Sequence, residues 1–116
     1  MASPKEKSQA TYQIRVTENA QQDIDYITGY IAFINHQPLN AIRVGDALFE
    51  TIDRIAQNPL AFRECEEIPT AGKIYRKAVC MSWLIIYKIK LPEVIILGVI
   101  HSARKPARIH KLRKIK

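Results

Sequence analysis

The alternation of hydrophobic and polar positions near the start of the chain predicts a strand. Tyr12, Ile14 and Val16 alternate with polar residues, and a period of two is typical of a strand with one buried face. Thr17 follows as a candidate helix N-cap, with Glu18 in the first turn, where the helix dipole favours an acid. We therefore expect a strand that leads directly into a helix.

Two amphipathic helices are predicted after this strand. Apolar residues recur there at spacings of three and four, which marks one buried face on each helix. They are Ala20, Ile24, Ile27, Ile31 and Ile34 in the first helix, and Ala41, Val44, Leu48, Ile52 and Ile55 in the second, which runs from about Leu39 to Gln57. The connection between the helices is short, so we expect an antiparallel hairpin whose joint apolar face covers a sheet.

A second stripe of large side chains lies beside the apolar face of the first helix. It consists of Tyr26, Tyr30 and Phe33. Two interpretations stay open for these aromatics, because a wide helix face can be buried in the core or left free for a partner.

Three further strands are predicted after a loop over residues 59–72. They span about 74–79, 83–89 and 94–100, and the run from Trp83 to Tyr87 is typical of a central strand that is covered on both faces. Short connections indicate an antiparallel meander. The predicted fold class is therefore α+β, in the order β-α-α-β-β-β, with an N-terminal helical hairpin packed on an antiparallel sheet.

The length of the chain fits one domain with two short extensions. The 116 residues are 47% hydrophobic, which is enough for one core. We expect a flexible lead over residues 1–10, a single domain over 11–104 and a basic tail over 105–116. Apolar residues every three positions make this tail either a short helix that orders on a partner or a frayed end. Removal of residues 105–116 is expected to leave the fold intact but to weaken action on the target.

Several classes of protein are disfavoured by what the sequence lacks. The chain has no apolar run near 18 residues, no apolar secretory signal, and only two cysteines, Cys65 and Cys80. We therefore expect a cytoplasmic protein that binds no membrane. Glycine-rich phosphate loops, metal-ligand spacings and Gly-x-Ser-x-Gly nucleophiles are also missing, so no cofactor and no metal are predicted.

Charge divides the chain into two unequal halves. Residues 1–72 carry 6 Lys and Arg against 10 Asp and Glu, a net charge of −4, whereas residues 73–116 carry 12 Lys and Arg against one acid, a net charge of +11. Such asymmetry predicts a basic surface built by the C-terminal half. Its partner would be a polyanion or an acidic protein segment.

Four segments in this order carry a resemblance to a known family. They are the opening Tyr12–Thr17, the helix with Ala20, Asp23, Ile24 and Tyr30, the aromatic–aliphatic strand Val79–Ile89, and the final strand Val94–Ile100 followed by His101 and Arg104. Over about residues 11–105 the chain resembles the RelE/ParE toxin superfamily of type II toxin–antitoxin (plasmid stabilisation) systems. The final strand with His101 and Arg104 is more similar to the ParE branch.

The resemblance implies two different activities. Toxins like ParE poison DNA gyrase, inhibit growth and are held inactive by a cognate antitoxin, and such complexes bind their own operator DNA through the antitoxin. Toxins like RelE instead cleave mRNA on the ribosome, with Lys and Arg on the sheet stabilising charge. Leu84 stands here where RelE ribonucleases commonly place an Arg, so non-enzymatic poisoning ranks above RNA cleavage.

Candidate functional residues follow from the charge and from the resemblance. We predict that Arg76, Lys77, His101, Arg104, Lys105 and Arg108 contact the target. If the chain is a ribonuclease, Arg76, Lys77, His101 and Arg104 are the candidate catalytic groups. A third hypothesis is a non-toxic basic module that binds nucleic acid through charge alone.

Overall fold

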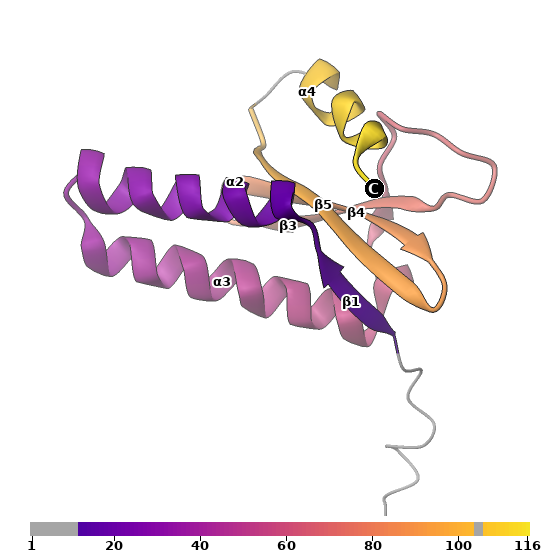
Figure 1. Cartoon of the computed structure of the whole chain (residues 1–116), viewed down its shortest axis with the longest axis horizontal. Coiled ribbons are helices and arrows are strands. Elements are labelled where there is room, and N and C mark those ends of the chain that lie inside the picture. The colour runs from indigo at the N-terminus through magenta and orange to yellow at the C-terminus, as the bar shows by residue number, and fades with distance from the viewer. Residues whose placement is uncertain (1–11, 104–105) are drawn as a thin grey trace, which may run out of the picture.

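A mixed five-stranded sheet is the centre of the fold (Figure 1), which the computed structural model describes over residues 12–103 and 106–116. The strands are β1 (Gln13–Val16), β2 (Arg63–Glu64), β3 (Tyr75–Cys80), β4 (Trp83–Lys90) and β5 (Glu93–His101), in the spatial order β1-β5-β4-β3-β2. The predicted α+β class and the antiparallel meander of β3, β4 and β5 are confirmed.

The sheet departs from the prediction at its two edges. β1 pairs with β5 in parallel, so the sheet is mixed and not antiparallel throughout. The connection from β1 to β5 contains the helical hairpin and the other three strands, so it is long enough to join parallel neighbours. At the other edge, β2 forms within the predicted loop and pairs with β3.

The helical hairpin forms as predicted, with one local difference. Its helices are α2 (Glu18–Gly29) and α3 (Pro38–Gln57), and the backbone N–H of Ala20 donates to Thr17 Oγ1 over 3.1 Å at the N-cap. The first helix does not stay α-helical to its end, because a π-helical turn, η1 (Tyr30–Ile34), follows α2. Figure 1 shows the two helices side by side and extending beyond the strands.

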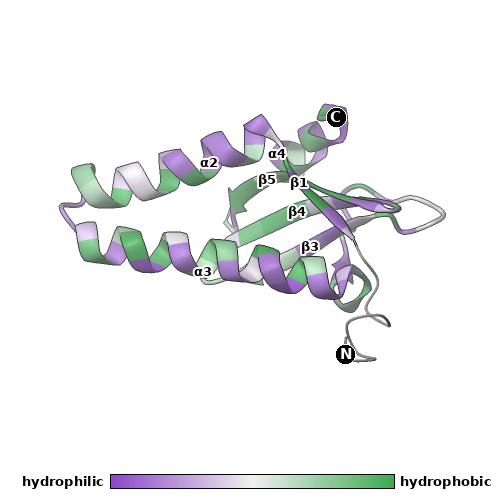
Figure 2. Cartoon of the chain, turned by 60° about the horizontal axis from the view of Figure 1, so that its bottom comes forward, coloured by the Kyte–Doolittle hydropathy of each residue, from purple (hydrophilic) through white to green (hydrophobic). Residues whose placement is uncertain are grey.

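Two hydrophobic cores lie on opposite faces of the sheet. The first joins the hairpin to the sheet and includes Ile24, Leu48, Ile55, Ile85, Tyr87 and Ile96. The second includes Cys65, Ile68, Tyr75, Ile86, Leu97, Ile109 and Leu112. β4 and β5 are predominantly hydrophobic in Figure 2, whereas the helices alternate, as expected for strands that are covered on both faces.

The second core is closed by the C-terminal segment, which the sequence suggested would need a partner or fray. It forms α4 (Pro106–Lys111) and the 3₁₀ turn η3 (Leu112–Lys114). Ile109 and Leu112 are only 3% and 7% exposed and pack on the sheet of their own chain. The segment is therefore part of the packed structure, because it covers apolar strand residues that would otherwise face water.

Polar side chains of α2 bind the backbone of β5 at an irregular point of the sheet. The register between β4 and β5 shifts between Ile86 and Tyr87, and such bulges leave backbone groups without a ladder partner. Thr17 Oγ1 donates to the carbonyl of Ile96 over 2.8 Å, and Asn19 Nδ2 donates to that of Leu97 over 2.9 Å. The N-terminal turns of α2 are thereby fastened to β5.

Gly98 permits this close approach, and its replacement by alanine is expected to destabilise the protein by about 1–3 kcal/mol through overpacking. An added Cβ would meet Leu112 Cδ2 at 2.9 Å, Asp23 Oδ2 at 3.1 Å and Asn19 Nδ2 at 3.2 Å. Gly29→Ala is the matched control, since nothing lies within 4 Å of its Cβ position and alanine favours a helix. Urea unfolding should show opposite signs for the two variants.

Within the two described ranges, no helix is both long enough and apolar enough to cross a membrane.

Candidate functional site: an aromatic groove beside the C-terminal helix

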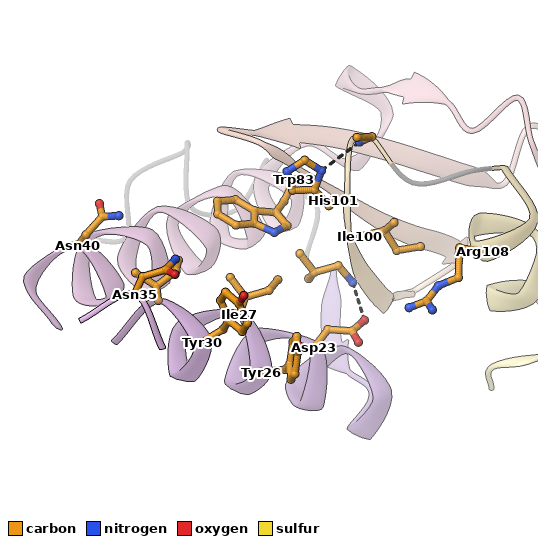
Figure 3. Close-up of a pocket in the computed structure, with 13 residues that line it drawn as sticks. Asp23, Tyr26, Ile27, Tyr30, Asn35, Asn40, Trp83, Ile100, His101 and Arg108 are labelled. Carbon is orange, nitrogen blue, oxygen red and sulfur yellow. Dashed lines mark hydrogen bonds between the residues drawn. The ribbon is translucent and has the colours of Figure 1, made fainter. Parts of the chain in front are cut away.

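A groove runs between the helical hairpin and the ends of β4 and β5, and reaches α4 (Figure 3). Its lining comes from segments that are far apart in the sequence. The lining residues are Asp23, Tyr26, Ile27, Tyr30, Ile31, Asn35, Asn40, Trp83, Val99, Ile100, His101, Ala103 and Arg108. The groove brings two predicted contact residues, His101 and Arg108, to one site.

Aromatic rings line both sides of this groove. Tyr26 and Tyr30 come from the hairpin, are 69% and 45% exposed, and have ring centroids 6.1 Å apart. Across the groove, Trp83 and His101 meet edge to face with centroids 6.0 Å apart. The two tyrosines are therefore exposed and not buried in the core. Exposed aromatic side chains are enriched where proteins bind partners.

His101 ends β5 with its imidazole held in one orientation. The backbone N–H of Ala103 donates to His101 Nδ1 over 3.1 Å. An accepting Nδ1 carries no proton, so the neutral ring has its proton on Nε2. His101 therefore offers a hydrogen-bond donor from Nε2.

Asp23 lies on the hairpin side of the groove. The backbone N–H of Val99 donates to Asp23 Oδ2 over 2.9 Å. Burial raises the pKa of Asp23 above its ordinary value, and the Val99 hydrogen bond and the charge of Arg108 only partly oppose this effect. Asp23 therefore presents a carboxyl group, hydrogen-bonded to the backbone of β5, on the hairpin side of the groove.

The raised pKa of Asp23 predicts how stability depends on pH. A carboxyl group that binds its proton more tightly in the folded state favours folding below its unfolded pKa, near 4, and this contribution is lost as pH rises through the folded pKa. Asn cannot ionise, so the free energy of unfolding of Asp23→Asn should increase relative to that of wild type as pH rises through the folded-state pKa of Asp23. Urea unfolding across the acid range measures it, with Asp25→Asn as the charge-matched control; a difference that shrinks with rising pH would contradict the prediction.

Arg76 is a predicted contact residue that the structure places away from the groove. Arg76 Nε donates to the carbonyl of Lys73 over 2.8 Å, and its Nη1 donates to those of Phe62 and Leu60 over 2.8 and 3.3 Å. These bonds hold the turn before β2 against β3. The guanidinium is therefore engaged in binding its own backbone.

Lys77 points to the opposite face of the sheet, because neighbouring strand residues alternate. Its side chain is 12% exposed, and Lys77 Nζ lies 3.2 Å from Glu67 Oε1 and 4.0 Å from Glu66 Oε1. In the register of the sheet, Arg76 is opposite Tyr87, whereas His101 is opposite Trp83. Trp83 and Tyr87 are four steps apart on β4, a rise of about 13 Å along the strand.

Of the remaining predicted contact residues, Arg108 lies at the groove and the other two cannot be placed. Arg104 and Lys105 lie outside the described residues. Arg108 is exposed at the end of the groove. Asp23, Asn35 and Asn40 line the groove although the sequence did not single them out as site residues. On the hairpin side of the groove, only the four-residue spacing of Tyr26 and Tyr30 indicated an exposed face.

The described residues form neither a metal site nor a site with an activated Cys65 thiol. No group of three or more His, Cys, Asp or Glu residues there could hold a metal ion. Cys65 is buried, and burial raises the pKa of its thiol to about 11, which opposes a nucleophilic role. The groove is thus a surface for contacts made by aromatic rings, amides and Arg108.

Comparison with known families decides the identity of this chain. The profile of the ParE toxin of the type II toxin–antitoxin system parDE matches residues 14–106. The chain belongs to the ParE toxin family. A comparison of the toxin with curated proteins gave no match.

Solved structures agree with the family at the level of the fold. The chromosomal ParDE system from P. aeruginosa matches with a TM-score of 0.62 and 18% identity, covering 79% of this toxin and 97% of that chain. The toxin–antitoxin complex RelBE2 from Mycobacterium tuberculosis matches with a TM-score of 0.53 and 20% identity, covering 78% and 98%. The predicted RelE/ParE superfamily is confirmed.

Proposed function

We propose that this ParE-family toxin inhibits growth by poisoning DNA gyrase, and that it acts by binding and not by catalysis. The observation that carries the proposal is the separation of Arg76, Lys77 and His101, three of the four candidate catalytic groups of a ribonuclease; the fourth, Arg104, lies outside the described residues. Arg76 binds backbone carbonyls, Lys77 is paired with Glu67 on the other face, and His101 ends β5 opposite Trp83, the first residue of β4.

RNA cleavage makes demands that this separation does not meet. A ribonuclease must stabilise negative charge on one phosphorus centre and move protons to and from the oxygens around it. The backbones at Arg76 and His101 stand about 13 Å apart along a strand. The Arg76 guanidinium is turned to its own backbone carbonyls, and Lys77 lies on the opposite face of the sheet, so this arrangement favours binding over RNA cleavage. Leu84, where RelE ribonucleases commonly have an Arg, packs against the second core and offers no charge.

A cognate antitoxin is the proposed regulator of the toxin. The two similar structures are a chromosomal ParDE toxin–antitoxin system and the toxin–antitoxin complex RelBE2. The exposed Tyr26 and Tyr30 and the cation of Arg108 fit an amphipathic antitoxin helix that carries apolar side chains and acids. We further propose that the complex binds operator DNA through the antitoxin and stabilises the plasmid or chromosomal segment that encodes the pair.

A gyrase cleavage experiment tests the proposed activity. Purified toxin, gyrase and plasmid DNA should give linear DNA after protein is removed with detergent and protease, whereas toeprinting of translated mRNA should show no new cleavage. Arg108→Gln should weaken the gyrase effect by about tenfold, the equivalent of roughly 1.4 kcal/mol of binding, while Arg43→Gln on α3 should leave it unchanged. Cleavage of mRNA between codon positions would overturn the proposal, and so would normal growth on induction without antitoxin.

A further inference from the structure

We propose that the C-terminal helical segment of this toxin binds the phosphate backbone of double-stranded DNA directly. The binding surface, here called the basic platform, consists of Arg108, Lys111, Arg113, Lys114 and Lys116, all exposed. The inference rests on the proposed function only for its biological role, since gyrase holds a DNA duplex. The DNA contact itself is a separate property of the toxin.

The basic platform is built around a buried row of apolar residues. Ile109, Leu112 and Ile115 recur every third residue; Ile109 and Leu112 are buried in the second core, and the partly buried Ile115 packs against it. Arg108, Lys111 and Lys114 each precede a member of this row, and Arg113 and Lys116 each follow one. The cations therefore flank the row on both sides and point away from the sheet.

Anchoring of the segment favours binding of a rigid polyanion. The packing of Ile109 and Leu112 fixes α4 and η3 on the sheet without a partner. A surface that is ordered before it binds avoids the cost of immobilising its backbone on binding. The cations lose only their own side-chain freedom when phosphates approach.

Acids leave most of the platform unneutralised. Residues 106–116 contain no Asp or Glu. In the described part of the chain, Glu66 and Glu67 pair with Arg63 and Lys77, and no ion pair involves a platform cation. Asp23 is the acid whose charge is felt by Arg108, at the groove end of the segment. The other platform cations are available for phosphates.

The surface favours duplex DNA over single-stranded RNA. Proteins that bind single strands stack exposed aromatic side chains on the bases. Residues 106–116 contain no Phe, Tyr or Trp, and Tyr75 of the underlying sheet face is buried in the second core. What remains is charge alone, which suits the dense and regular phosphates of a duplex.

Salt-dependent binding to a short fluorescent DNA duplex tests the platform, with full-length toxin and no gyrase present. If about three phosphates are contacted, log affinity should fall with log salt at a slope near −3 between roughly 50 and 200 mM. Lys111→Gln with Lys114→Gln should reduce this slope by about two and weaken binding at low salt at least tenfold. Both substitutions spare the buried row.

Arg43→Gln with Arg63→Gln is the control, since it removes the same charge from α3 and β2 and should keep the slope. An equal loss in both double variants would overturn the proposal, and so would tighter binding to single-stranded RNA than to the duplex. Because gyrase is absent, DNA binding by a toxin that fails the cleavage experiment would still support the platform. Gyrase poisoning by a toxin without DNA affinity would overturn it while leaving the proposed function intact.

Discussion

Removal of residues 106–116 is expected to lower the free energy of unfolding by about 3–6 kcal/mol. Ile109 and Leu112 are nearly fully buried in the second core, and burial of each such side chain contributes about 1.5–3 kcal/mol. Domains of this size have only about 5–15 kcal/mol in total. This expectation replaces the one from sequence, in which the tail was dispensable for folding.

Urea unfolding of the shortened chain measures the loss, and alkylation of Cys65 gives a local readout because this thiol belongs to the same core. Ile109→Ala with Leu112→Ala should reproduce most of the effect in the full-length protein. Lys111→Gln with Lys114→Gln should not, since those side chains are exposed. An unchanged unfolding midpoint after truncation would show that the segment contributes no stability.

Tyr87→Ala is expected to cost about 3–5 kcal/mol, the range for removal of a large aromatic side chain from a core. Tyr87 is completely buried between the hairpin and the sheet and packs edge to face on Phe62, with centroids 6.3 Å apart. Its hydroxyl donates to the carbonyl of Pro59. Desolvation raises the pKa of this hydroxyl, which keeps it a neutral donor.

Tyr87→Phe separates a packing role from a chemical one. The ring stays, but the Pro59 carbonyl loses its donor, so we expect a cost of about 1–3 kcal/mol. The growth inhibition per folded molecule should match wild type after induction at permissive temperature. A variant with unchanged stability and abolished toxicity would instead make Tyr87 part of the functional machinery.

Site residues were predicted less completely than the fold, because a side chain's partners are set by distant segments. The period of a strand already requires Arg76 and Lys77 to point to opposite faces. Arg76 binds the carbonyls of Leu60 and Phe62, 16 and 14 residues away in sequence, because β2 pairs with β3. A cation seen in sequence therefore does not reveal whether it is free.

The groove shows the same limit more strongly. Tyr26, Trp83 and Arg108 lie in three separate elements and meet only because α2 runs beside β5 and α4 packs on the sheet. Spacing within one element can identify a face, as it did for Tyr26 and Tyr30. It cannot say what stands opposite that face.

Local patterns in the sequence predicted the hairpin, the three-strand meander and the family, but not β2 or the π-helical turn. Periods of two and near 3.6, the Thr17 cap and the short connections specify the hairpin and the meander, because these depend on neighbours in the chain. Only the tertiary structure decided that β1 joins β5 in parallel and that Ile109 and Leu112 close a second core. The parallel pairing and the second core both bury apolar surface between residues that are far apart in the chain. Local periodicity carries no information about which distant residues will meet.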